Sequence, residues 1–192
     1  MRGAVSYDAS MSARRFRRLR RDPSGSLRVE HARAELDHYA SPEAAKSIRE
    51  HGFLERYRRP TLIGFSFAPK GETWSKGHRG ATTLVRSVFE GNFVDPSRPE
   101  DRPIDVFRGT TATPAWNAMV SKISDDVGLD WDAEPDDEWW RKREELATRL
   151  RRELLRRKID AVQAGGEVIV VNPKSLRVLQ PRWWGGQRDR RR

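Results

Sequence analysis

A run of four apolar, β-branched residues near the carboxyl end, Val168, Ile169, Val170 and Val171, most constrains what this chain can fold into. Such side chains favour a pleated strand, and turn residues flank the run on both sides, Gly165-Gly166 before it and Asn172-Pro173 after it. The pattern predicts a buried strand. A lone acid, Glu167, stands at its entrance, and residues 175–179 are predicted to return beside it as a hairpin partner.

The amino-terminal part predicts a strand at residues 36–40 that runs directly into a helix. Ser41 is suited to cap this helix, Pro42 fits its first turn, and Gly52 is suited to end it. Glu43 complements the positive end of the helix dipole. We therefore expect a strand, a capped helix and a sharp stop within a short stretch of chain.

Three further strands are predicted in the middle of the chain, at residues 61–67, 82–89 and 92–94. Glu90-Gly91 is expected to separate the last two strands. Residues 69–80 form a polar, glycine-punctuated segment, which is predicted to be a loop that covers a ligand.

The chain then changes to a helical pattern. Residues 113–128 predict a helix that buries one stripe, and residues 136–158 predict a second helix with acids at its start and bases at its end. The stripe of the first helix is expected to be core, and it consists of Trp116, Met119, Val120, Ile123 and Val127. The charges of the second helix, with the pair Glu145 and Arg149, are interpreted as a solvated face.

The composition excludes several classes of protein. The chain has 192 residues, no cysteine, 36% apolar residues and 34% charged residues, which predicts one domain with extensions, without disulfides or thiolate chemistry. No stretch has the length of a membrane span or the character of a signal peptide, so a cytoplasmic location is expected. The four histidines lack metal-ligand spacing, so no metal site is predicted, and glycine-rich phosphate loops are missing.

The net charge of +10 is concentrated at the two ends of the chain. Residues 1–26 are interpreted as a basic flexible arm with an arginine cluster at 14–21, and residues 182–192 as a basic tail. Residues 27–181 are expected to form the domain, with a helical insertion at about 113–158. The basic ends suit a polyanionic partner, either nucleic acid or an acidic protein. The alternative without a partner is a solvated arm that keeps the protein soluble.

Two separated segments resemble motifs of the ADP-ribosyltransferase and poly-ADP-ribose polymerase superfamily. Residues 158–179, with Glu167, resemble its closing strands, and residues 36–53, with His38, resemble its first strand and helix. A third segment, Gly64-Phe65-Ser66-Phe67-Ala68, is similar to its second motif strand. The resemblance covers roughly residues 29–179. It implies an α+β fold with a split antiparallel β-sheet core and a helical insertion, and it implies NAD as cofactor.

The resemblance also implies roles for individual residues. Glu167 would be the catalytic acid that offsets positive charge on the ribosyl group, and His38 would donate a hydrogen bond to a ribose hydroxyl. The backbone of Tyr39 would contact the nicotinamide amide. Ser66 stands where the polymerase branch has a tyrosine that stacks on nicotinamide, so another aromatic residue is expected to supply that platform. The candidates are Phe65, Phe67, Tyr39 and Trp74.

Taken together, the resemblance implies an enzyme that transfers ADP-ribose from NAD to a protein or nucleic acid, in the manner of a toxin or phage effector. Three alternatives stay open. The same scaffold is compatible with a non-catalytic nucleic-acid-binding protein, with an inactive interaction module, or with an NAD-dependent RNA 2'-phosphotransferase.

Overall fold

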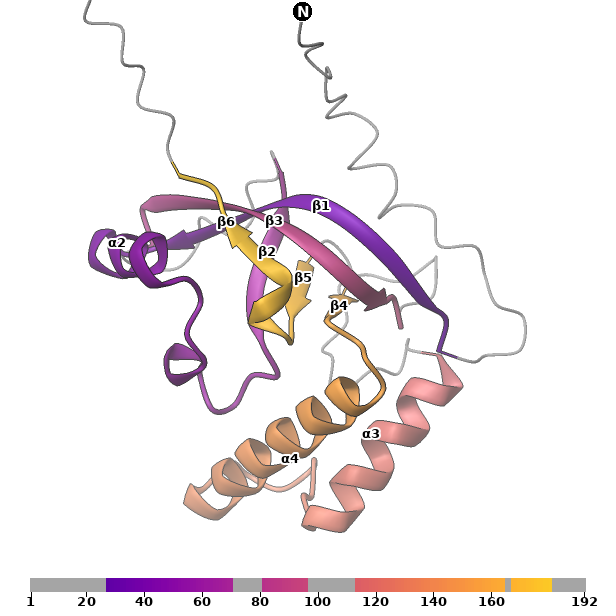
Figure 1. Cartoon of the computed structure of the whole chain (residues 1–192). Helices are drawn as coiled ribbons and strands as arrows, with labels where there is room; N and C mark the ends of the chain where they lie inside the picture. Colours follow the sequence, from indigo (N-terminus) through magenta and orange to yellow (C-terminus); the bar gives the residue numbers. More distant parts are fainter. Residues whose placement is uncertain (1–26, 71–80, 97–112, 165–166, 181–192) are drawn as a thin grey trace, which may run out of the picture.

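The computed structural model describes residues 27–70, 81–96, 113–164 and 167–180. The basic arm, the basic tail and most of the predicted covering loop, including Trp74, lie outside these residues. Within them the chain is an α+β structure in which a mostly antiparallel sheet carries helices on two sides (Figure 1). The predicted α+β class is confirmed.

The sheet closes into a barrel. Its strands are β1 (Val29–Ala40), β2 (Phe65–Pro69), β3 (Thr83–Val94), β4 (Ala161–Ala164), β5 (Glu167–Val170) and β6 (Leu176–Val178). The first five pair in the order β1-β2-β5-β4-β3, and β3 pairs back onto β1, so a five-stranded barrel results. The β3–β4 pair is parallel, and β6 is added to β3. The predicted antiparallel sheet is thus found in its coarse form, as a closed, mostly antiparallel barrel with one parallel pair.

Two cores result from the alternation of side chains along the strands. One core fills the barrel and includes Leu36, Phe67, Phe89 and Val168, with Phe53 beside them. Small barrels are filled in this way by inward-facing side chains. Residues that alternate with these, such as Ile169, face outward into a second core formed with the helices. The strand at 168–171 is apolar throughout because it is buried on both faces.

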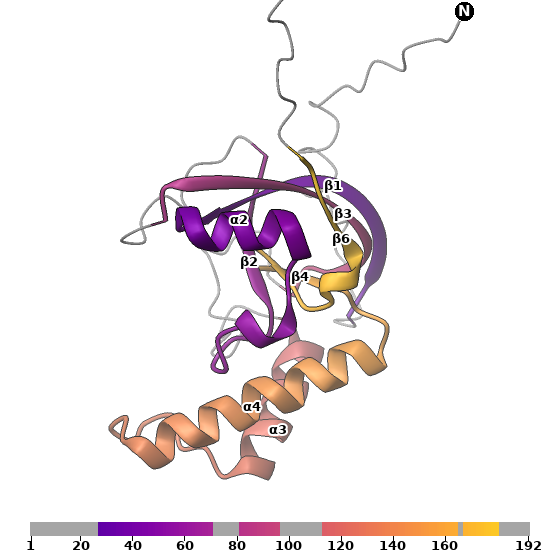
Figure 2. The same ribbon diagram turned by 60° about the vertical axis from the view of Figure 1, so that its left-hand side comes forward.

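Three α-helices are found in the described residues: α2 (Pro42–His51), α3 (Pro114–Val127) and α4 (Asp137–Arg156). The helix α2 lies beside β1 and β3, whereas α3 and α4 form a pair on another side of the barrel (Figures 1 and 2). The capping prediction for α2 is confirmed, because the Ser41 hydroxyl accepts from the Ala44 backbone N–H at 3.2 Å. The helix stops at Gly52, which has a φ of 76°.

The two longer helices also agree with the sequence pattern. The apolar stripe of α3 packs into the second core, with Trp116 fully buried. Asp136 caps α4 by accepting from the Trp139 backbone N–H at 2.7 Å, and the pair of Glu145 and Arg149 forms at 2.6 Å. A helical insertion was predicted at this place, and the structure has α3 and α4 there.

Two strand predictions were wrong. Glu90-Gly91 does not break β3, which continues through both residues in its ladder with β1. A Cβ at position 91 would lie 2.7 Å from the Asp160 Oδ2 atom, so any larger residue there would displace the Asp160 side chain. The predicted hairpin partner of β5 was also wrong, because β5 pairs with β4 and β2 while β6 pairs with β3. A 3-10 turn at Pro173–Ser175 leads the chain away from β5.

Gly64→Ala tests how tightly β2 approaches β5. A Cβ at position 64 would lie 2.2 Å from the Val170 backbone oxygen, so the strands would have to separate. We expect a loss of unfolding free energy on the order of 3 kcal/mol, measured by chemical denaturation. Gly52→Ala is the control, since it meets no atom within 4 Å and suffers only from its φ of 76°, worth about 1 kcal/mol. Equal losses in the two variants would contradict this close approach.

Candidate functional site

The three segments that carry the sequence motifs lie on neighbouring strands. Asp37 of β1 pairs with Ala68 of β2, and Phe67 of β2 pairs with Val168 of β5. The strands β1 and β5 come from opposite ends of the domain, and direct pairing with β2, which lies between them, brings them together. The motif strands β1, β2 and β5 therefore form one continuous surface.

Glu167 begins β5 and faces the outside of the barrel. It precedes Val168, which faces the interior, and alternates with it, so it shares the outer side with Ile169. Ser66 pairs with Ile169 and lies on that side too. Glu167 is partly buried, and no hydrogen bond or ion pair reaches its carboxylate from the part of the chain that the structure describes. It is therefore a carboxylate that a ligand could engage.

His38 faces the opposite way, into the barrel. Its ring lies 5.2 Å from Phe53 in an edge-to-face arrangement and 5.3 Å from Phe67, measured between ring centroids. Its Nδ1 lies 2.8 Å from the Ser66 backbone oxygen. A carbonyl oxygen only accepts, so Nδ1 carries the hydrogen and donates it. His38 thus joins β1 to β2 through this bond.

The environment of His38 keeps its ring neutral. Burial lowers the pKa of His38 below its ordinary value of 6.5, and the bond to the Ser66 carbonyl only partly opposes this. In a neutral ring whose Nδ1 donates, Nε2 holds a lone pair and accepts. The expectation that His38 donates a hydrogen bond to a ribose hydroxyl is therefore corrected, because its remaining nitrogen is an acceptor.

The structure does not bring His38 and Glu167 onto one face. His38 lies with Phe67 on the inner side of the sheet, and Glu167 lies with Ser66 on the outer side. Two strand spacings, about 10 Å, also separate their backbones. Glu167 and His38 were expected to face each other across one cleft. The strand register does not allow this, because the two side chains point to opposite sides of the sheet.

The other residues that were predicted to contact the cofactor are also divided between the inner and outer sides of the sheet. Tyr39 alternates with His38 along β1 and so faces outward, as Ser66 does. Phe67 has no exposed surface and contacts His38 and Phe53, so its predicted cofactor contact is corrected. Trp74 lies outside the described residues. Of the proposed aromatic platforms within the described residues, Tyr39 is the one that shares the outer face with Glu167.

An ion pair between a buried acid and a partly exposed arginine, which the sequence did not reveal, also lies on the outer face. Asp37 is only 2% exposed, and Arg86 of β3 donates to both of its oxygens, from Nε at 2.7 Å and from Nη2 at 3.0 Å. Asp37 and Arg86 are opposite each other in the β1–β3 ladder. The only available signal was an acid inside an apolar strand pattern, which implies a partner but does not identify it.

No group of three or more His, Asp or Glu side chains in the described residues is placed to hold a metal ion. None of the described helices combines the length and the apolar character that a bilayer span requires.

Comparisons of the chain with models of known protein families, with curated proteins and with solved structures find no match. The candidate site is thus defined by the chain's own geometry, and we refer to the outer surface formed by Tyr39, Ser66 and Glu167 as the outer motif face.

His38→Asn tests the neutral state of the imidazole. The amide can still donate to the Ser66 carbonyl but cannot titrate. Because the folded-state pKa of His38 is lowered, the unfolded state binds more protons as the pH falls through about 6.5, and wild-type stability declines there. We expect denaturation at pH 8 and pH 5 to show a smaller acid-induced loss in His38→Asn. An equal loss in both proteins would contradict a buried, neutral His38, and His31→Asn, on an exposed ring, is the control.

Proposed function

We propose that this chain transfers ADP-ribose from NAD to a macromolecular acceptor, using the outer motif face. The observation that carries the proposal is that the motif strands β1, β2 and β5, far apart in sequence, are paired neighbours in the barrel. In addition, Glu167 on this face has no partner among the described residues. An ADP-ribosyltransferase-like arrangement of the core belongs to the same proposal.

The reaction breaks the bond between the ribose C1' atom and the nicotinamide nitrogen, and its electron pair leaves with nicotinamide. A lone pair of the acceptor forms the new bond to C1', and the acceptor's proton passes to solvent. ADP-ribosylated acceptor, nicotinamide and one proton result. The ribosyl group has oxocarbenium character in the transition state, so a negative charge beside it lowers the barrier.

Glu167 is the residue that supplies this charge in the proposal. Its backbone is held in β5 by pairing with β4, and the strand behind it is buried on both faces. A carboxylate fixed in this way needs little reorganisation when charge develops. By analogy with single fixed groups in other enzymes, its contribution is about 3 kcal/mol.

Tyr39 and Arg86 would hold the cofactor on the same face. Ser66 provides no ring, and Tyr39, which alternates with His38, supplies an aromatic surface beside it for nicotinamide. Arg86 keeps guanidinium N–H groups beyond those that bind Asp37, and these suit the diphosphate. His38 would act as a positioning residue, since it binds the Ser66 carbonyl from the inner side.

The placement of His38 favours one alternative. With the imidazole on the inner side and Glu167 on the outer side, the same scaffold could bind a ligand without catalysing transfer. That alternative predicts no release of nicotinamide under any condition. Activity measurements therefore separate the two functions directly.

Glu167→Gln is expected to lower nicotinamide release from NAD by about 10²- to 10³-fold, because the side chain keeps its size and loses its charge. The measurement is chromatography of NAD and nicotinamide after incubation of the full chain with a cell lysate. Glu90→Gln is the matched control, since Glu90 is an exposed acid on β3. Equal activity in Glu167→Gln and wild type would reject the assignment, and absence of activity in wild type would favour the binding role.

Tyr39→Leu is expected to raise the KM for NAD roughly tenfold with a smaller change in kcat, because an aromatic platform is lost while the carboxylate remains. Tyr57→Leu is the control, because Tyr57 is 57% exposed and lies outside the strands. An unchanged KM in Tyr39→Leu would show that another ring holds nicotinamide.

A further inference from the structure

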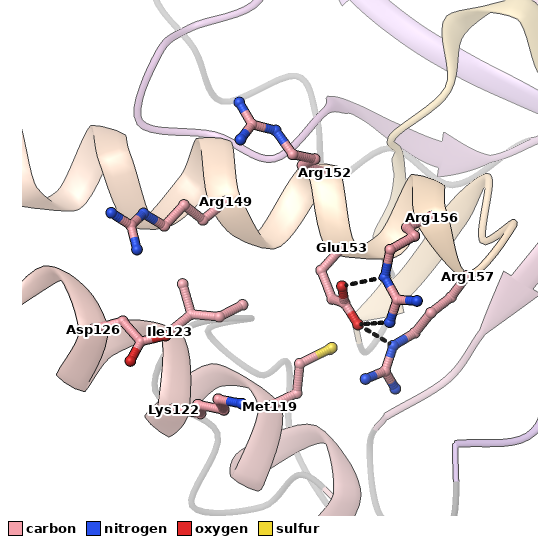
Figure 3. Close-up of a pocket in the computed structure, with 9 residues that line it drawn as sticks. All are labelled: Met119, Lys122, Ile123, Asp126, Arg149, Arg152, Glu153, Arg156 and Arg157. Atoms are coloured by element: carbon pink, nitrogen blue, oxygen red, sulfur yellow. Dashed lines mark hydrogen bonds and ion pairs between the residues drawn. The ribbon is translucent and has the colours of Figure 1, made fainter.

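A groove lies between α3 and α4, and none of the residues of the outer motif face lines it (Figure 3). Its volume is about 440 Å³. Side chains of both helices line it, and none comes from a strand. The lining residues are Met119, Lys122, Ile123, Asp126, Arg149, Arg152, Glu153, Arg156 and Arg157. Five of these are cations and two are acids, so the groove carries a net positive charge.

The negative charge of one of the two acids, Glu153, is already balanced by arginines within the groove. Glu153 accepts from Arg156 at 2.8 Å through both of its oxygens, and from Arg157 at 2.6 Å. The hydrogen bond from Arg156, followed by that from Arg157, lowers the pKa of Glu153 to about 2. Glu153 therefore stays ionised and serves to hold two guanidinium groups in place, as Figure 3 shows.

Two other cations of the groove are available to a ligand. Lys122 on α3 and Arg152 on α4 have no carboxylate partner in the part of the chain that the structure describes. Arg149 is bound to Glu145 through Nε and Nη2 and keeps its other terminal nitrogen. Cations thus lie on both helices that line the groove, although the guanidinium of Arg152 points to the side of α4 away from α3 (Figure 3).

We propose that the groove between α3 and α4 binds the phosphate backbone of a nucleic acid. Four of its five cations are arginines, whose planar fork matches the oxygens of a phosphate. Arg149 and Arg156 are seven residues apart on one helix, which spans about 10 Å, so several successive phosphates of a strand lie within their reach. The lining contains no aromatic side chain, so bases are not stacked there and binding is independent of sequence.

An acidic protein helix fits this groove less well. Binding of an amphipathic helix requires an apolar trough with well-buried anchors. The apolar part of the floor consists of Met119 and Ile123, and Met119 is only 8% exposed. Little apolar surface is left for a partner's side chains, and charge supplies most of the attraction.

The test uses the full chain and a short fluorescently labelled DNA duplex, without NAD. The groove variant is the double substitution Lys122→Gln with Arg152→Gln, which removes two cations and breaks no described ion pair. The control is Lys46→Gln with Arg59→Gln, which removes one lysine and one arginine from exposed positions outside the groove. The basic ends stay the same in all three proteins.

Affinity is measured by fluorescence anisotropy between about 50 and 200 mM salt. In wild type and control we expect log K to fall equally steeply with log salt. In the groove variant we expect the slope to be less steep by about 2, since two phosphate contacts are lost. Two duplexes of unrelated sequence should bind wild type equally. Circular dichroism confirms that the variants are folded.

Three results would overturn the proposal. The first is that wild type binds neither duplex. The second is that the groove variant has the same salt slope as the control. The third is that polyglutamate of equal charge displaces the labelled duplex as effectively as unlabelled duplex does. The last result would assign the groove to acidic proteins. Because NAD is absent throughout, none of these outcomes depends on transferase activity.

Discussion

The backbone ladder between β1 and β3 is the constraint on which the rest of the structure depends. It runs along the whole of both strands, from the pair of Val29 with Val94 to the pair of Ala40 with Thr83. It closes the barrel, and it fixes which side of β1 each residue occupies. Leu36 and His38 are turned inward and Asp37 is turned outward, where Arg86 binds it. The two cores and the outer motif face all follow from that single register.

Asp160 transmits this register to the carboxyl-terminal strands. Its backbone N–H donates to the Asn92 backbone oxygen at 2.7 Å, and its Oδ2 atom accepts from the Asn92 backbone N–H at 2.9 Å. Its Oδ1 atom accepts from the Asn172 side chain at 2.7 Å. These bonds join the end of β3 to the segments before β4 and after β5. The hydrogen bonds of Asp160 with Asn92 and Asn172 therefore help to position β5, which begins at Glu167, in addition to apolar packing.

Local features of this fold could be predicted from sequence, and long-range ones could not. Caps and stops act within one helical turn, so Ser41, Asp136 and Gly128 mark their helices reliably. The apolar run of β5 likewise identifies a buried strand. Its partner, however, depends on where the chain goes after Pro173, and β4 was missed because Gln163 interrupts its short apolar pattern.

The candidate site shows the same limit. The resemblance implies that Glu167 and His38 lie on neighbouring strands, whereas β2 lies between β1 and β5. The face that each side chain occupies depends on strand register, and a shift of one residue reverses it. The motif match places each residue on a strand without specifying that register. Phe67 is excluded as a cofactor contact for the same reason, since its side chain points to the inner side of the barrel, as that of His38 does.

The basic groove is a consequence of how α4 makes its core. Leu146, Leu150 and Leu154 recur every fourth residue and are fully buried against the barrel and α3. Residues offset from this stripe must then emerge along its border. Arginines occupy that border at the carboxyl-terminal end of α4, where cations also complement the helix dipole. Because α3 packs alongside, the border becomes the wall of a groove instead of an open charged surface. The same helical period that stabilises the domain thus creates a second, separate surface for an anion.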